Sequence, residues 1–232
     1  NDEFDMAYID IDEDESTFFF FFAELYLENS NRKKIVYAGL YWSGTYRYNA
    51  GIQKSEKKFI PSDASRGTFS SVKLKLPNKE KYIDVSGQVI FDGAGKNEFD
   101  EIAPYAVYAD ITDYLKELSN ASGVYSVANV KATQGIIEGG VSAGWTIFIV
   151  YEDQNMSGKF VSSYDGFAGV TDKSTDIVFN GFQTLPEGNV RAKIACAALE
   201  GDNNLLGDQL LFSSNESKLF TPLRTNIKKE KN

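Results

Sequence analysis

A serine within a glycine-rich segment is the first candidate for chemistry in this chain. Residues 140–144, Gly-Val-Ser-Ala-Gly, have the G-x-S-x-G spacing of the nucleophile elbow of serine hydrolases. A working elbow places the serine between a strand and a helix, and the serine also needs a base. The residues after Ser142 are β-branched and aromatic, which favours a strand, and the chain contains no histidine. We therefore predict a turn that leads into a central strand, and no catalytic role for Ser142.

Three aspartates at alternate positions, Asp10, Asp12 and Asp14, are the candidates for binding a metal ion. Alternate carboxylates can converge on a calcium ion, a hard cation that takes several oxygen ligands. In a strand, the same spacing simply points the carboxylates to solvent. Because the glycine and the closing glutamate of an EF-hand loop are missing, the segment predicts either a solvated strand end or a calcium site of another kind.

Aromatic residues near position 42 are candidates for ligand contact. Trp42 and Tyr46, in the segment YWSGTYRY, could form a platform on which a sugar ring stacks. In an all-β chain, aromatic residues at this spacing also suit the core and cross-strand pairs. The sequence leaves both interpretations open.

A run of five phenylalanines from residue 18 to residue 22 is the second aromatic feature. A strand with rings on both faces must be covered on both faces, or it exposes an apolar patch that favours association. We predict a buried or interface strand here. Phe18, Phe20 and Phe22 are its candidate partner contacts.

The elements that must position these residues are mostly strands. Apolar and polar residues alternate along segments 71–77, 83–91 and 189–199, and turn clusters separate them. The only cysteine, Cys196, falls in the apolar series of the last segment, so we predict that it is buried. One segment has helical spacing, which predicts a short helix near Ile111 to Leu118.

These patterns predict an all-β fold in which two antiparallel sheets pack face to face, a jelly-roll-like β-sandwich with one short helix. We find no repeat and no linker. We therefore predict a single sandwich domain over residues 1–223, followed by a basic, polar tail over residues 224–232.

Composition excludes several classes of function. The net charge of -9 disfavours nucleic acid as a partner. The absence of histidine removes the usual general base and the commonest transition-metal ligand. No apolar run reaches the length of about 18 residues that spans a bilayer, so we expect no membrane span.

A resemblance to a known family is carried by five segments, which are 34–46, 123–132, 143–153, 163–167 and 198–212. In this order, they resemble the N-terminal β-domain of bacterial gliding-motility-type surface adhesins, which the type 9 secretion route exports. The resemblance implies an extracellular or cell-surface module, with the secretion or outer-membrane machinery among its partners. Domains of this kind continue beyond the position of Asn232, which implies that the sandwich is incomplete at its C-terminal end or is completed by another chain.

Together, these observations predict a non-enzymatic secreted or cell-surface module with an adhesive or structural role. Its partners would be a surface, host or substratum ligand such as a glycan, and a second chain through an open sheet edge. The alternative is a carbohydrate-binding module or a glycoside hydrolase on the same sandwich. A glycosidase needs two facing carboxylates, and 33 acidic residues leave that possibility open.

Overall fold

A computed structural model of the chain describes most residues up to position 170 and short segments beyond it. The chain forms two compact units, Asn1–Leu199 and Glu200–Asn232, and each is described by itself. For Phe20 and Phe21, the structure describes the backbone and not the side chain. The described residues are 3–10, 12, 14–18, 20–28, 33–54, 58–170, 174–181, 183, 193–196, 209–213 and 219–223.

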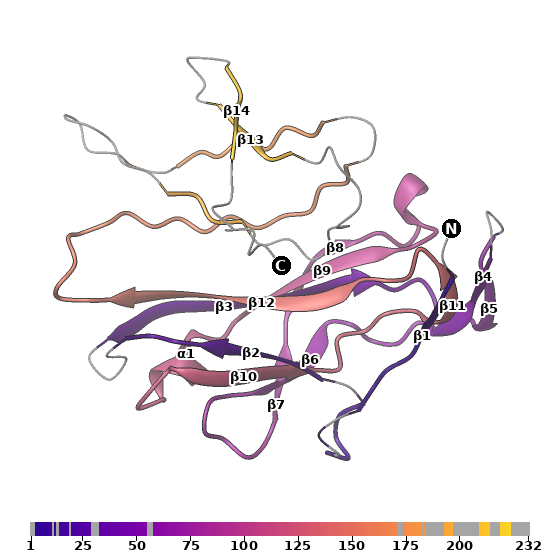
Figure 1. The fold of residues 1–232 in the computed structure, drawn as a ribbon, viewed down its shortest axis with the longest axis horizontal. Helices are drawn as coiled ribbons and strands as arrows, with labels where there is room; N and C mark the ends of the chain where they lie inside the picture. Colours follow the sequence, from indigo (N-terminus) through magenta and orange to yellow (C-terminus); the bar gives the residue numbers. More distant parts are fainter. Residues whose placement is uncertain are drawn as a thin grey trace, which may run out of the picture. The chain divides into compact units, whose positions relative to one another are not determined.

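One layer of the first unit is a four-stranded antiparallel sheet, called here the β3 sheet (Figure 1). In spatial order, its strands are β12 (Ala143–Glu152), β3 (Lys34–Thr45), β9 (Pro104–Asp110) and β8 (Gln88–Asp92). The strand after Ser142 is predicted to be central, whereas among the described strands β12 lies at the edge of this sheet. The apolar outer face of β12 packs along its own sheet, where Phe148 contacts Tyr41 of the neighbouring β3 with ring centroids 5.7 Å apart.

The second layer, the β10 sheet, is also four-stranded and antiparallel. The predicted strand over residues 83–91 divides at Gly87, so that β7 belongs to this sheet and β8 to the β3 sheet. Gly87 is thus a corner where the chain passes from one layer to the other. In spatial order, the strands are β2 (Phe20–Leu25), β10 (Gly123–Ala128), β6 (Ser71–Lys75) and β7 (Ile83–Ser86).

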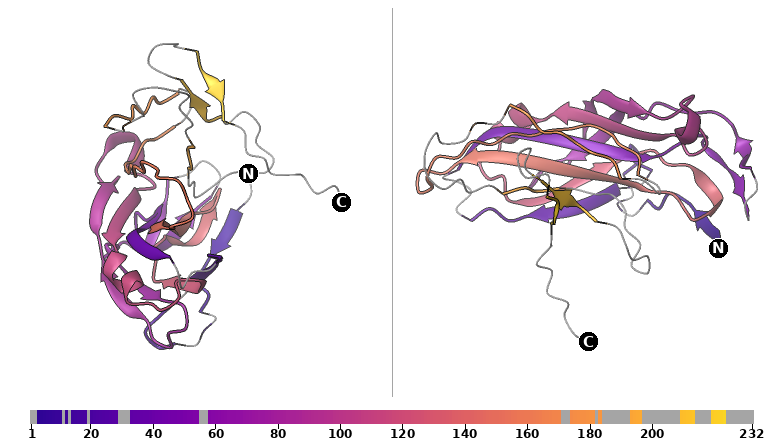
Figure 2. Two further views of the ribbon diagram at one scale, coloured as in Figure 1. Left: turned by 90° about the vertical axis from the view of Figure 1, so that its left-hand side faces the viewer. Right: turned by 90° about the horizontal axis from the view of Figure 1, so that it is seen from above.

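The inner faces of these two sheets make one hydrophobic core. Leu40, Trp42 and Val107 from the β3 sheet share it with Leu74 and Val127 from the β10 sheet, and all five are at most 1% exposed. Figure 2 shows the two layers from two further directions. Burial of alternate residues in both sheets drives the layered packing. The predicted all-β, mainly antiparallel sandwich is confirmed.

A third sheet and short helices complete the first unit. The sheet contains one parallel pair, β11 with β4. The helix α1 (Thr112–Lys116) lies within the predicted range of Ile111 to Leu118, and Ile111 and Leu115 anchor it in the core. A 3-10 helix, η2, covers Asn97–Phe99. In spatial order, the strands of the third sheet are β1 (Glu3–Met6), β11 (Gln134–Glu138), β4 (Ala50–Gln53) and β5 (Ile60–Asp63).

The segments after β12 differ from their prediction. Within the predicted strand 189–199, the described residues 193–196 form no strand, and Cys196 is exposed, so its predicted burial is wrong. A strand forms where a neighbouring strand pairs with its backbone, and alternation in the sequence does not supply that neighbour. The second unit contains the short pair β13 (Leu211–Phe212) and β14 (Thr221–Pro222). The predicted domain over residues 1–223 stays a prediction, and the tail 224–232 lies outside the described residues.

Candidate functional site

Ser142 lies in the connection between β11 and β12, and a strand follows it directly. Its backbone N–H donates to Thr45 Oγ1 over 3.3 Å, and its carbonyl accepts the Thr45 N–H over 2.9 Å. The segment is therefore a turn that feeds a strand, as predicted, and it lacks the strand–turn–helix geometry of an elbow.

Trp42 and Tyr46 are core residues, which corrects their prediction as ligand contacts. Trp42 is 1% exposed and donates its indole N–H to the carbonyl of Phe69 over 2.9 Å. Tyr46 is fully buried, and its hydroxyl donates to Asn49 Oδ1 while accepting the N–H of Gly67. Rings buried to this degree cannot stack on a ligand.

The end of the phenylalanine run, from Phe20 to Phe22, lies in the edge strand β2, which pairs with β10. Phe18 comes just before this strand and is half-buried against Tyr8, with ring centroids 4.8 Å apart. Phe22 is 64% exposed. The side chain of Phe20 lies outside those that the structure describes. The prediction of partner contact at these residues stays a prediction.

Asp12 and Asp14 accept hydrogen bonds from other side chains, and the predicted calcium site stays a prediction. Asp12 Oδ2 accepts the hydroxyl of Tyr82 over 2.7 Å and lies 3.4 Å from Lys75 Nζ. Asp14 Oδ1 accepts both the N–H and the hydroxyl of Ser16. Among the described residues, no group of three acidic or other metal-ligating side chains is placed to hold a metal ion. A lysine that occupies one carboxylate also opposes a second cation there.

From this arrangement we expect the thermal unfolding midpoint to be the same in calcium and in a chelator. A ligand that binds only the folded state raises the midpoint, so an unchanged midpoint means no calcium binding. Differential scanning fluorimetry measures both conditions. A midpoint that rises with calcium concentration would show that the loop rearranges around the ion.

Asp12 is instead expected to stabilise the fold in a pH-dependent way. Although burial opposes its ionisation, hydrogen bonds from Tyr82, Thr17, the backbone of Asp14 and Lys75 together lower the pKa of the carboxyl group below its ordinary value. A group whose pKa is lower in the folded state stabilises that state above its unfolded pKa, and this contribution disappears as the pH falls through the folded pKa.

We therefore expect Asp12→Asn to lower the free energy of unfolding by about 1–2 kcal/mol at pH 7. The two chains should approach equal stability once the pH is below the folded pKa of Asp12, where the carboxyl group is protonated in both states. Urea titrations at the two pH values make the comparison. The same difference at both pH values would contradict a role for the ionised carboxylate.

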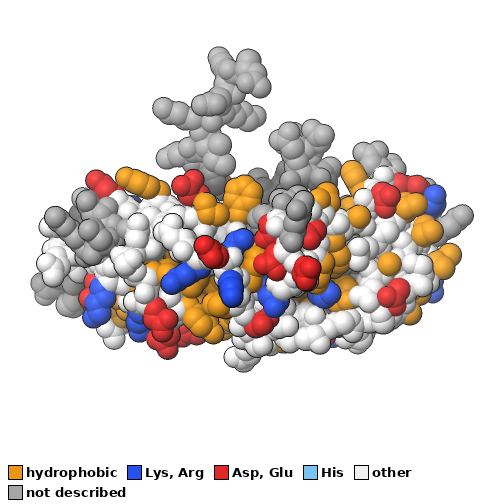
Figure 3. All heavy atoms as spheres, turned by 90° about the horizontal axis from the view of Figure 1, so that it is seen from below, with side chains coloured by type: hydrophobic (Ala, Val, Ile, Leu, Met, Phe, Trp, Pro, Cys, Tyr) orange, Lys and Arg blue, Asp and Glu red, His pale blue; other side chains and the backbone are white. Residues whose placement is uncertain are grey.

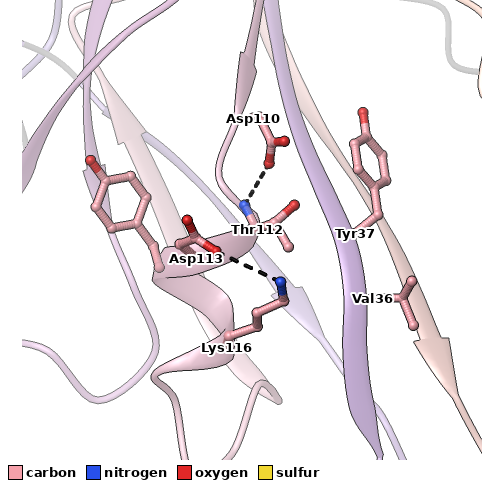
Figure 4. Close-up of a pocket in the computed structure, with 7 residues that line it drawn as sticks. Val36, Tyr37, Asp110, Thr112, Asp113 and Lys116 are labelled. Carbon is pink, nitrogen blue, oxygen red and sulfur yellow. Dashed lines mark hydrogen bonds and ion pairs between the residues drawn. The ribbon is translucent and has the colours of Figure 1, made fainter.

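In the described part of the chain, an open pocket lies where α1 meets the first residues of β3. It has a volume of about 630 Å³, and it is lined by aromatic, acidic and basic side chains. Figure 4 shows Asp110, Asp113 and Lys116 near α1, and Tyr37 and Val36 on β3. Tyr114, 41% exposed, also lines it. This volume and mixture of groups suit a small polar ligand.

Hydrogen bonds hold α1 against β3 and so fix the shape of this pocket. The hydroxyl of Thr112 accepts the N–H of Ala38 over 2.9 Å, and the N–H of Ile111 donates to the carbonyl of Ala38 over 2.9 Å. Asp110 Oδ1 accepts the N–H of Thr112 over 2.9 Å. Hydrogen bonds from Thr112 lower the pKa of Asp110, so that it remains a carboxylate at neutral pH.

Tyr37 continues the pocket into a row of tyrosines on the outer face of the β3 sheet. Its hydroxyl donates to that of Tyr108 over 3.2 Å and lies 3.4 Å from that of Tyr41. Burial, together with these hydroxyl bonds, raises the pKa of Tyr37 above its ordinary value. The phenol of Tyr37 therefore stays neutral at pH 7.

Sequence reasoning missed this pocket. Its residues come from two segments far apart in the chain, and each segment looks ordinary alone. No signal in either segment pointed to the other.

Comparison with known proteins found no matching family model, no matching curated protein and no matching solved structure. None of the helices that the structure describes has the length and apolar character that crossing a membrane requires. The resemblance to the gliding-type adhesins therefore stays a prediction, and the geometry of the pocket is the guide to function.

Proposed function

We propose that this chain is a non-enzymatic module of the bacterial cell surface with an adhesive role, and that it holds a saccharide in the pocket between α1 and β3. The single observation that supports the ligand is the meeting of two tyrosine rings with two aspartates in one pocket. The rigid sandwich supports the adhesive role, because it holds such a pocket in place under load. Secretion machinery and a surface or host glycan are the partners that this role requires.

The chemistry of the pocket favours a saccharide over other small ligands. The C–H face of a sugar packs on an aromatic ring, and Tyr37 and Tyr114 offer rings on different elements. Sugar hydroxyls donate hydrogen bonds, and Asp110 is an ionised acceptor. Lys116 lies 3.7 Å from Asp113 and offsets its charge, which leaves the pocket less attractive to a bare cation.

A glycan array probed with the purified chain tests this proposal. The expected result is saturable binding to a small set of saccharides, with no reducing sugar released from the same saccharides over hours. Release of reducing sugar would support the glycoside hydrolase instead. Absence of binding to every saccharide on the array would remove the ligand from the proposal.

A further inference from the structure

The outer edge of β12 is the longest unpaired strand edge in the described part of the chain. β12 pairs with β3 along its whole length, from Ala143 opposite Gly44 to Glu152 opposite Lys34. No strand among the described residues pairs with its other side (Figure 1). An unpaired edge presents a row of backbone N–H and C=O groups that another strand can satisfy.

The other sheet edges are protected and β12 is not. Short length, charge and proline are the usual protections, because each of them hinders the addition of a strand. The other edge strands of the first unit have four to six residues, and each carries a charged residue or a proline. β12 has ten residues, and none from Ala143 to Tyr151 is charged or a proline. Figure 3 shows the contrasting pattern on another face, where hydrophobic side chains lie between charged ones of both signs.

The side chains of β12 are only partly covered. Trp145, Ile147, Ile149 and Tyr151 contact the core, yet all of them remain partly exposed. A strand added beside β12 would cover these side chains and pair the free backbone groups. The gain is largest along the regular part of β12, because the register shifts between Val150 and Tyr151.

We propose that β12 of one chain pairs antiparallel with β12 of a second copy, which joins two β3 sheets into one continuous sheet. Two copies present the same strand edge, so a single twofold axis between them pairs the backbone groups of both edges. With the axis at Ile147, Trp145 of each copy faces Ile149 of the other on the core side. This inference does not depend on the ligand of the pocket.

Charge supports a second copy in the antiparallel direction. The chain carries a net charge of -9, so two copies repel each other unless their contact is neutral. The seam along residues 143–151 has no charge, and the acids beyond it are paired, Glu152 with Lys34 and Asp153 with Lys33. Antiparallel pairing also places the two acidic ends at opposite ends of the seam, about 30 Å apart.

Sedimentation of the whole chain over a range of concentrations tests the proposal. The expected species is a dimer of twice 25.8 kDa. Thr146→Lys places two like charges beside the twofold axis and should give a monomer with an unchanged circular dichroism spectrum. Ile60→Lys, an equal change on the exposed edge strand β5, should remain dimeric.

Cysteine pairing keeps the test decisive if Thr146→Lys fails to fold. In a Cys196→Ser background, an oxidised mixture of Thr146→Cys and Phe148→Cys chains should give more disulfide dimer than either variant alone, because these positions face each other across the axis. A chain that is monomeric at every concentration overturns the proposal. This holds even if a strand of another protein pairs with the edge of β12. Equal crosslinking in all three samples overturns it as well.

Discussion

Replacing Trp42 with alanine is expected to lower the free energy of unfolding by about 3–5 kcal/mol. The indole is 1% exposed in the centre of the sandwich, so its removal leaves a cavity between the two sheets. It also leaves the carbonyl of Phe69 without the indole N–H that it accepts over 2.9 Å. Urea unfolding followed by circular dichroism measures the loss.

Trp145→Ala is the matched control, because Trp145 lies opposite Trp42 in the β12–β3 register but is only partly buried at the sheet edge. We expect a smaller loss of about 1–2 kcal/mol. Equal losses for the two variants would mean that the core does not lie where the structure places it.

Replacing Gly87 with valine is expected to lower the free energy of unfolding by about 3 kcal/mol. A Cβ atom at this corner would lie 2.5 Å from Trp42 Cη2, 2.6 Å from the carbonyl oxygen of Tyr108 and 2.7 Å from Val107 Cγ1. The backbone at Tyr108 is held by pairing with β3 and β8, so it cannot move away easily. The clash therefore spreads the two sheets or opens the corner between β7 and β8.

Gly158→Val provides the control, because nothing lies within 4 Å of a Cβ atom at that position. Its stability should stay within about 0.5 kcal/mol of the unchanged chain. Thermal and urea unfolding of both variants give the comparison. A Gly87→Val chain as stable as the Gly158→Val chain would contradict the close approach of the two sheets at Gly87.

The fold could be predicted because half-buried strands alternate. Val72 and Leu74 of β6 are buried while Lys73 and Lys75 are not, which is the pattern that identified the strand. Alternation does not say which face of a strand is the core when both carry large rings. Tyr41 and Trp42 are neighbours on opposite faces of β3, and only packing against the second sheet decides that Trp42 is inside.

The number of neighbours that a strand has is also hidden in the sequence. β12 is apolar on both faces, which suggested a central strand, yet it lies at the edge of its sheet. Apolar side chains on both faces indicate that other layers pack above and below the strand. Neighbouring strands pair through backbone groups, which are the same for nearly every residue, so the side chains do not show how many neighbours there are. The same cause explains why the described residues 193–196 form no strand, although the alternation over 189–199 predicts one.

The candidate site was the least predictable part. Asp110 directly precedes the predicted helix, but Tyr37, which lines the same pocket, belongs to a strand much earlier in the chain. The aspartates at 10, 12 and 14 had a recognisable spacing, yet Lys75 and Tyr82 from elsewhere in the fold bind the middle one. Contacts between residues distant in sequence determine both the pocket beside α1 and the surroundings of Asp12. The spacing of residues along the chain carries no information about such contacts.

Titration calorimetry with the best-bound saccharide of the array, on Tyr114→Ala and Trp42→Phe chains, tests the central claim most directly. If the pocket between α1 and β3 is the ligand site, Tyr114→Ala should weaken binding about tenfold or more, equivalent to about 1.4 kcal/mol. Trp42→Phe keeps an apolar ring in the core and should leave the affinity unchanged. Lost binding in Trp42→Phe with full binding in Tyr114→Ala would contradict the account.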